Sequence, residues 1–265
     1  MKRAIIRIVS AGGIVLLAWF GLTVWNTGFR TPSYNRLPLP ASLIAADSSA
    51  GHKLFAESQF TADYDDLNKN FVSQARPAFC GVASSVTVLN ALHSSPQISQ
   101  KNFFDDAASK VRKELAVSFG GMTLAQLRDL LAVHGVDARL NYASDTTLDA
   151  FRALAKENLK TPGDFILINY QRGKIGQRES GHISPLAAYH EASDRFLILD
   201  VAAYKYSPVW VSAQALWAAM QAVDTTSGRS RGFVVVRQGA AAVADKAAQS
   251  QAPLKTVNFD GKVRR

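Results

Sequence analysis

The sequence predicts an α+β fold in which a helical lobe carrying a candidate nucleophile packs against an antiparallel sheet lobe, with a cleft between them. Two observations predict this class. Apolar residues recur at helical spacing in the first half of the chain, and segments rich in β-branched and aromatic residues gather in the second half. About 180 to 210 residues remain when the two ends are set aside, which suits one globular domain with a proper core.

Residues 1–28 have the pattern of an export signal or membrane anchor. Lys2, Arg3 and Arg7 precede an uncharged run over residues 8–25, which at ~1.5 Å per residue nearly crosses a hydrocarbon core. Cations ahead of the run predict a cytoplasmic N-terminus and an exported domain at the periplasmic face of the inner membrane. We favour an uncleaved anchor, because no clear small-x-small cleavage site closes the run. Cleavage within residues 41–46 is the alternative, and it would leave the domain free in the periplasm.

The rest of the chain divides into three parts. Residues 29–56, rich in proline, serine and alanine, are expected to form a spacer. Residues 57–238 are the expected catalytic domain. Residues 239–265 contain few large apolar side chains and are expected to be a disordered tail.

Charge and cysteine content exclude several function classes. The formal net charge is +9, but residues 1–30 contribute +4 and residues 239–265 contribute +3. The remaining +2 belongs to the domain between these two ends, which has no run of basic residues interleaved with aromatic ones. Nucleic-acid binding is therefore a poor hypothesis. The single cysteine excludes an intramolecular disulfide and a thiolate-rich metal cluster.

That cysteine, Cys80, is placed by the sequence in the first turn of a helix. Pro77 favours an extended approach to the helix. The residues after Cys80 that recur at helical spacing are Val82, Val86, Leu89 and Leu92. Free backbone N–H groups and the positive dipole end favour a thiolate there, which makes Cys80 a candidate nucleophile. The alternative is a buried cysteine that serves as a small hydrophobe.

Further elements follow in order. Thr123 and Gln126 form a capping box for a helix that Gly135 ends, and a second helix is expected over residues 147–159. Four segments have the composition of strands: residues 165–170, 183–189, 195–201 and 233–237.

The hairpin predicted from residues 183–189 and 195–201 supplies partners for Cys80. If residues 190–194 form the turn, residues that face each other across the two strands have numbers that sum to about 382 to 384. His182 and Asp200 then lie on the same face of the hairpin, with Cβ atoms about 4.5 to 8 Å apart. Asp200 would then fix the imidazole tautomer and leave the other ring nitrogen to accept the proton of Cys80. A half-buried polar pair that only pins the hairpin is the alternative.

Three motifs, in the same order along the chain, resemble the catalytic domain of phytochelatin synthase. They are Phe-Cys-Gly-Val-Ala-Ser at residues 79–84, Gly-His-Ile-Ser-Pro-Leu-Ala-Ala-Tyr at residues 181–189, and Phe-Leu-Ile-Leu-Asp-Val at residues 196–201 followed by Tyr-Lys-Tyr-Ser-Pro-Val-Trp at residues 204–210. The resemblance covers about residues 60–237. It implies a papain-like two-lobed fold, because that family belongs to the papain-like cysteine peptidase superfamily.

The resemblance also implies roles for particular residues. Cys80 would be the acyl-forming nucleophile, His182 the base and acid, and Asp200 the residue that orients the imidazole. Gln74 would help form an oxyanion hole with the backbone N–H of Cys80. The expected reaction opens the bond between cysteine and glycine in glutathione and holds γ-glutamylcysteine as a thioester.

Four further residues match family positions near the glutamyl end of glutathione. They are Gly181, Arg172, Asp224 and Arg231. Asp224 suits the ammonium group of the substrate, and Arg231 suits its carboxylate through a bidentate fork. The alternative for Asp224 and Arg231 is a surface ion pair seven positions apart.

Two positions depart from the family pattern. Phe79 stands where relatives often have tyrosine, and Ala203 stands where many synthases have an arginine. No cysteine-rich domain follows in this sequence, so we expect no metal bound by the protein itself. Cadmium or zinc would act as a thiolate complex of the glutathione substrate. We therefore expect mainly hydrolysis to γ-glutamylcysteine and glycine, with weak phytochelatin synthesis.

Other classes stay open at this stage. One alternative is an exported papain-like endopeptidase that processes a peptide and needs a long open cleft. Another is a membrane-tethered binding module with an inactive triad, which the presence of all three catalytic residue types disfavours. The expected partners are glutathione and, through residues 8–25, the membrane, and a homodimer is also an open alternative.

Overall fold

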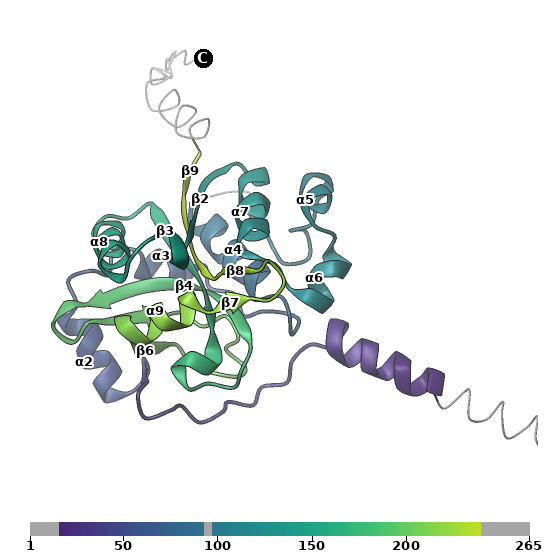
Figure 1. Ribbon diagram of the computed structural model, residues 1–265, viewed down its shortest axis with the longest axis horizontal. Coiled ribbons are helices and arrows are strands. Elements are labelled where there is room, and N and C mark those ends of the chain that lie inside the picture. The colour runs from purple at the N-terminus through teal and green to yellow at the C-terminus, as the bar shows by residue number, and fades with distance from the viewer. Residues whose placement is uncertain (1–15, 93–96, 240–265) are drawn as a thin grey trace, which may run out of the picture.

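A seven-stranded antiparallel sheet lies at the centre of the computed structural model, which describes residues 16–92 and 97–239 (Figure 1). The strand order is β1-β6-β5-β4-β3-β9-β2. Helices cover both faces, so the α+β class predicted from the sequence is confirmed. Most of the expected tail and the first part of the expected anchor lie outside the described residues.

The strands of this sheet are β1 (Ile44–Ala45), β2 (Val136–Tyr142), β3 (Asp164–Gln171), β4 (Gly181–His190), β5 (Arg195–Ile198), β6 (Val209–Ser212) and β9 (Gly232–Gln238). A separate two-stranded ribbon consists of β7 (Val223–Asp224) and β8 (Arg229–Ser230).

Most of the helices lie between β1 and β3 in the chain. The α-helices are α2 (Ser49–Glu57), α3 (Tyr64–Lys69), α4 (Cys80–Leu92), α5 (Asp106–Val111), α6 (Glu114–Gly120), α7 (Leu124–Val133), α8 (Leu148–Asn158) and α9 (Ala213–Gln221). Short helical turns are η1 (Trp25–Phe29), η2 (Ala143–Asp145), η3 (Arg172–Ile175) and η4 (Glu191–Ser193).

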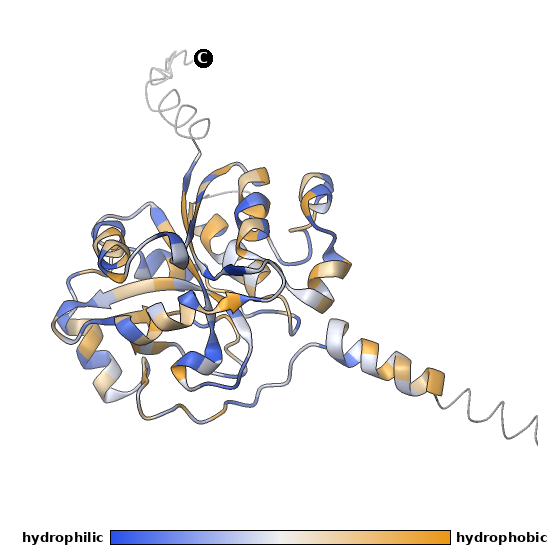
Figure 2. Cartoon of the chain, viewed as in Figure 1, coloured by the Kyte–Doolittle hydropathy of each residue, from blue (hydrophilic) through white to orange (hydrophobic). Residues whose placement is uncertain are grey.

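Alternation along β3 builds two hydrophobic cores. Phe165 and Leu167 pack into the core that contains residues of α4 and α7, while Ile166 and Ile168 pack into the core of α8 and α9. Successive side chains of a strand point to opposite faces, so a strand buried on both sides must be apolar throughout. Figure 2 shows apolar residues running through the sheet and along the sheet-facing sides of these helices.

Local sequence signals explain where several helices begin. The capping box of Thr123 and Gln126 is present at the start of α7, and the hydroxyl of Thr147 accepts a hydrogen bond from the N–H of Ala150 at the start of α8. Both helices were expected within one or two residues of these bounds. The residue patterns did not predict α9, the short helices α2, α3, α5 and α6, or the strands β1, β2, β6, β7 and β8.

Part of the expected spacer contributes to the fold. In that range, Ile44 pairs with Trp210 as β1 joins the edge of the sheet. Helix α2 follows, capped by the hydroxyl of Ser48, which accepts from the N–H of Gly51. Residues 44–57 therefore form ordered secondary structure beside the sheet.

The N-terminal segment is helical over residues 16–24 and continues as η1, projecting from the rest of the molecule (Figure 1). Within the described ranges, no helix has both the length and the apolar character needed to cross a membrane.

The β4–β5 hairpin contains a β-bulge that sets the register of the site. Next to the turn, His190 pairs with Arg195 and Ala188 pairs with Leu197, but farther along Leu186 pairs with Ile198. Two residues of β4 thus correspond to one of β5 at this point, and Ala187 is the extra residue. The bulge changes the parity of the pairing, so His182 and Asp200 fall on the same face of the hairpin.

Candidate functional site

Helix α4 begins at Cys80, as the apolar spacing predicted. The helix is buried from Gly81 to Asn90 and lies between the sheet and neighbouring helices. One turn after Cys80, the hydroxyl of Ser84 donates to the carbonyl oxygen of Ile183 at 3.0 Å. This bond fixes the start of α4 against β4, one residue from His182.

His182 and Asp200 meet as the hairpin register requires. Nε2 of His182 lies 2.9 Å from Oδ1 of Asp200, and both side chains are buried. Because Asp200 is ionised, Nε2 carries the hydrogen and donates it. Nδ1 is then left without a hydrogen and is available as a base.

Asp200 is held from three sides. Its Oδ1 accepts from Nη2 of Arg172 at 2.7 Å and from the backbone N–H of Ala202 at 2.9 Å, in addition to His182. Nη1 of Arg172 lies 2.7 Å from Oδ2. Burial alone would raise the pKa of Asp200, but the charges and hydrogen bonds of Arg172 and His182 outweigh it and lower that pKa below its usual range. Asp200 is therefore a fixed negative charge.

The free protein holds Cys80 and His182 in their neutral forms. Burial raises the pKa of the Cys80 thiol, and a hydrogen bond with the backbone of Ile183 and the charge of Arg172 offset this only in part. Burial and the charge of Arg172 lower the pKa of His182 to about 4, against the opposing effect of Asp200. The sequence analysis expected the helix start to favour a thiolate, but in this buried site desolvation is the larger effect.

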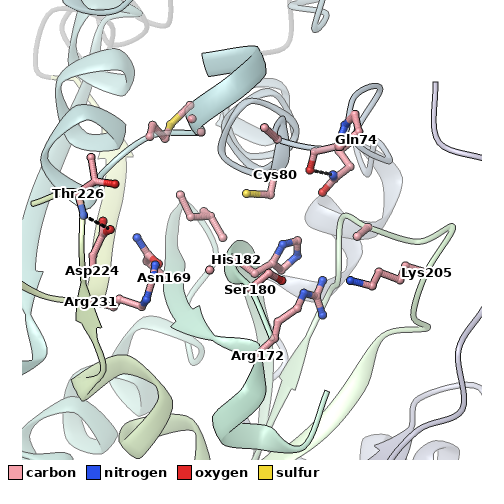
Figure 3. A pocket seen from close by; sticks show the side chains of 18 of the residues that line it. Gln74, Cys80, Asn169, Arg172, Ser180, His182, Lys205, Asp224, Thr226 and Arg231 are labelled. Atoms are coloured by element: carbon pink, nitrogen blue, oxygen red, sulfur yellow. Dashed lines mark hydrogen bonds between the residues drawn. The ribbon is translucent and has the colours of Figure 1, made fainter. Parts of the chain in front are cut away.

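A cavity of about 440 Å³ contains the reactive groups. Cys80 and His182 lie between Asp224 and Arg231 on one side and Lys205 on the other (Figure 3). The volume falls within the range of small-molecule sites. Charged groups therefore flank a candidate nucleophile and base from two directions.

Gln74 lines this cavity, but its amide donors face its own loop. Nε2 donates to the carbonyl oxygens of Arg76 at 2.9 Å and Pro77 at 2.8 Å. The backbone N–H of Gln74 donates to the carbonyl oxygen of Val201 at 2.8 Å, which ties the loop to the segment after Asp200. Gln74 thus shapes the approach to α4, and its predicted oxyanion role would require one of these donors to be released.

Arg231, Gly181 and Asn169 form a compact group in the cavity wall. Nη1 of Arg231 donates to Oδ1 of Asn169 at 2.8 Å. A Cβ atom on Gly181 would lie 2.7 Å from the same Nη1, so the guanidinium packs directly against the Gly181 backbone. Burial lowers the pKa of Arg231, partly countered by the charge of Asp224. This explains why a residue without a side chain stands before His182.

Asp224 lies in the same wall and is nearly buried. Its Oδ1 accepts from the backbone N–H of Thr226 at 3.1 Å. Among the described residues no ion pair joins Asp224 to Arg231, so the surface ion pair considered as an alternative is not present. Both residues remain predicted substrate contacts.

Arg172 lines the cavity, and its guanidinium is engaged with the triad carboxylate candidate. Its side chain is 1% exposed and pairs with Asp200, so the predicted contact with the glutamyl end of the substrate stays a prediction. It also donates to Oε1 of Gln177 and lies over the ring of Tyr206, 5.0 Å from the centroid. A guanidinium engaged in this way holds Asp200, the carboxylate that binds His182.

Sequence reasoning missed several cavity residues. Asn169 could have been noticed as the one amide within the buried stretch of residues 165–170. Lys205 and Tyr204 lie within the family motif, but nothing in the sequence alone directs them toward the cavity. Met122 follows α6, and its sulfur would lie 2.5 Å from a Cβ atom on Gly81. Across the described residues, no group of three or more His, Cys, Asp or Glu side chains is arranged to hold a metal ion.

Comparisons with known proteins agree with the motifs. The family model described as phytochelatin synthase matches residues 34–233. The chain is 33% identical over 211 residues to glutathione gamma-glutamylcysteinyltransferase 1 of Lotus japonicus, which covers 77% of this chain and 42% of that protein. It is 28% identical over 211 residues to glutathione gamma-glutamylcysteinyltransferase of Schizosaccharomyces pombe, covering 77% and 51%. The chain thus spans about half the length of the curated relatives it matches.

One solved structure is similar at greater distance. Xylellain, a cysteine protease from Xylella fastidiosa, shows 12% identity and a TM-score of 0.36, with 79% of this chain and 92% of that chain covered. The likeness is too distant to carry an argument about this chain.

Proposed function

The chain belongs to the phytochelatin synthase family, and we propose that it cleaves glycine from glutathione through a thioester on Cys80. The observation that carries this proposal is that Cys80 and His182 line one cavity of about 440 Å³, while the fully buried Asp200 binds His182 from behind. The nucleophile stands at a helix start, the base has a free ring nitrogen, and a buried carboxylate orients the base.

In the first half of the reaction, the Cys80 sulfur attacks the carbonyl carbon of the cysteine residue in glutathione. Nδ1 of His182 accepts the thiol proton as the new C–S bond forms. The imidazolium then donates that proton to the glycine nitrogen as the C–N bond breaks. The products are free glycine and a γ-glutamylcysteinyl thioester on Cys80. The helix N-terminus and the N–H of Cys80 face the developing oxyanion.

Charges in the cavity suit the glutamyl end of the substrate. The guanidinium of Arg231 matches a carboxylate, and the carboxylate of Asp224 matches an ammonium group. Both line the cavity on the same side of Cys80 (Figure 3). Lys205 lies on the other side, where the glycine of the substrate would leave.

In the second half, water or a second glutathione attacks the thioester, and we propose that water is the main acceptor. Water is present at about 55 M, so a millimolar acceptor must gain roughly 6 kcal/mol from binding and orientation to compete. Ala203 cannot offer the arginine contact of many synthases, which is worth about 1.5 to 3 kcal/mol. Lys205 offers a single charge without the bidentate fork of arginine.

The decisive experiment measures glycine release from glutathione by the purified full-length protein. We expect release that Cys80→Ser and His182→Ala abolish while the protein stays folded, because serine has no comparable thiolate fraction and alanine cannot accept a proton. Release that persists in either variant would exclude the proposed triad.

The hydrolysis preference has its own test. With excess glutathione and cadmium or zinc, which enters as the thiolate complex of the substrate, the main product should be γ-glutamylcysteine. Ala203→Arg should increase the yield of longer chains. Abundant products with two or more γ-glutamylcysteine units from the unmodified protein would contradict the preference.

An exported endopeptidase is the second candidate function. It shares the same triad, but a cavity of about 440 Å³ with charges at both sides fits a short zwitterionic substrate better than an extended polypeptide. A library of internally quenched peptides compared with glutathione separates the two. Cleavage of the peptides without glycine release from glutathione would favour the endopeptidase.

We also propose that the protein is anchored at the periplasmic face of the inner membrane. The support is the order of cations and apolar residues in positions 2–25 of the sequence. A phosphatase that is active only outside the cytoplasm should work when fused after residue 265. Activity restricted to a cytoplasmic reporter would overturn this location.

A further inference from the structure

We propose that helix α6 is a second membrane contact, in which Leu115 and Phe119 enter the interface of an anionic bilayer beside the N-terminal helix. The inference rests on the proposed anchoring and deepens it. It predicts how the catalytic domain is oriented, with one wall of its cavity next to the membrane surface.

The first observation is the distribution of exposed apolar side chains. In the helical segment of residues 16–25, the exposed large apolar residues are Leu16, Leu17, Trp19, Phe20, Leu22 and Trp25. At 3.6 residues per turn, these six positions are spread around all sides of the helix. A helix that is apolar all round is stable when lipid or protein surrounds it.

The second observation is that α6 presents an apolar face to the outside. Leu115 is 58% exposed and Phe119 is 44% exposed. Residues four positions apart lie on one face of a helix, while Val117 and Ser118 on the inner face are buried. Single exposed apolar residues are common, so their position relative to the N-terminal helix decides their meaning.

These two apolar surfaces are continuous. The rings of Phe29 and Phe119 meet edge to face with centroids 5.7 Å apart. A Cβ atom on Gly28 would lie 2.6 Å from the Phe119 ring, so the end of the helix packs closely on α6. The guanidinium of Arg76 lies 5.4 Å from the Phe29 ring centroid and pairs with Glu114 at 2.8 Å. Figure 1 shows α6 as the element nearest the end of this helix.

Charge next to α6 suits anionic headgroups. Lys110 at the end of α5 and Lys113 at the start of α6 are both exposed. Neither takes part in an ion pair within the ranges that the structure describes. Lysine beside exposed leucine and phenylalanine is the pattern of a segment that lies in a membrane interface.

The contact would bring the membrane close to the reactive site. Gly120, Gly121 and Met122 follow the exposed face of α6 directly and line the cavity of Cys80. Nε of Arg112 donates to the carbonyl oxygen of Gly121 at 2.9 Å, which ties this wall to the turn before α6. The domain would therefore sit with this wall toward the lipid surface and α2 far from it.

Because Cys80 is the single cysteine of the chain, replacing it leaves a protein in which an introduced cysteine is labelled alone. In a Cys80→Ala background, one probe cysteine is introduced at a time and labelled with an environment-sensitive fluorophore. Leu17→Cys reports on the N-terminal helix, Leu115→Cys on α6, and Lys53→Cys on α2 at the opposite end of the molecule (Figure 1). The full-length protein is reconstituted into phosphatidylcholine vesicles with phosphatidylglycerol, containing lipids brominated at the ~5–10 Å depth of interfacial segments.

We expect bromolipid to reduce the fluorescence at positions 17 and 115 and to leave position 53 unchanged. Loss of signal at position 17 without loss at position 115 would overturn the α6 contact while the anchor stands. Unchanged fluorescence at all three positions would overturn the anchor and the contact together. Equal quenching at positions 53 and 115 would overturn the proposed orientation.

Discussion

Arg172 and Asp200 form a fully buried ion pair, with Nη2 and Nη1 of the guanidinium each 2.7 Å from one oxygen of the carboxylate. This pair allows Asp200 to meet two requirements of the proposed triad. Asp200 has to stay charged although it is buried, and it has to hold the imidazole of His182. Arg172 supplies the compensating charge, and its cost is a lower pKa for His182.

Removing the charge of Arg172 should change the pH profile. In the free enzyme, His182 has a pKa of about 4, lowered by burial and by Arg172. Arg172→Gln should raise that pKa toward its ordinary value near 6.5, so the acid limb of kcat/KM moves to higher pH. Arg172→Lys keeps the charge and is the control. Identical acid limbs in the two variants would show that the charge has no such effect.

The same variant should also unfold more easily. Breaking a buried pair by removing one partner costs about 3 to 5 kcal/mol, because the other charge stays buried without compensation. Urea unfolding at pH 7 measures this loss. The loss should shrink in the double variant Arg172→Gln with Asp200→Asn, and a loss of equal size there would argue against the pair as the cause.

Asp200→Asn should reduce glycine release by roughly 10³- to 10⁴-fold, because an amide can hold the ring in the wrong tautomer. Single-turnover kinetics with glutathione measures this step. Ala202→Ser is a suitable comparison, since the Ala202 backbone donor to Asp200 is kept. A rate near that of the unmodified protein would make Asp200 a structural residue only.

Gly181→Ala should weaken glutathione binding. The new Cβ would lie 2.7 Å from Nη1 of Arg231 and displace the guanidinium from Asn169. Loss of a charged hydrogen bond costs about 1.5 to 3 kcal/mol, so KM should rise by about 10-fold or more while kcat changes less. Gly173→Ala is the matched control, because its nearest neighbour would be at 3.5 Å. Equal KM values in both variants would contradict the role of Arg231.

Asp63→Asn should stabilise the protein above neutral pH. Asp63 is fully buried, its carboxylate oxygens have no hydrogen-bond partner among the described residues, and burial with the charge of Asp164 raises its pKa to about 9. The folded state therefore holds a proton that the unfolded state loses above about pH 4, so stability contributed by this group falls as pH rises to about 9.

Urea unfolding at pH 5 and pH 8.5 tests this sign. The variant should gain roughly 1 to 4 kcal/mol at the higher pH and less at the lower. Asp65→Asn on the exposed side of α3 is the control. A gain that is the same at both pH values would contradict the linkage.

The sequence predicted the main parts of the site for physical reasons that are local. A cysteine before an apolar helical repeat has to lie at a helix start, and Cys80 does. His182 and Asp200 could be brought together by counting residues in a hairpin. The prediction from that count is correct only because of the bulge at Ala187. Without the bulge, the pairing next to the turn would place His182 and Asp200 on opposite faces of the hairpin. No local sequence signal specifies such a bulge.

What the sequence could not provide depends on contacts between distant segments. Arg172 follows a buried strand directly, and only the packed structure shows that its guanidinium binds the carboxylate of Asp200. The side-chain amide of Gln74 donates to two carbonyl groups of its own loop and to the hydroxyl of Tyr204, and no residue pattern reveals these partners. Short elements such as β1 and β6 are specified by their neighbours in the sheet more than by composition.

The position of β9 between β3 and β2 has a consequence for how the protein is made. The last strand of the domain, which ends at Gln238, is an interior strand, and β2 pairs only with it in the described sheet. Contacts of such wide sequence separation form late and slowly. A chain synthesised as far as residue 230 already contains Cys80, His182 and Asp200, but β2 and β3 still lack the strand that pairs with both of them. The sheet is therefore complete only when synthesis of the domain is finished.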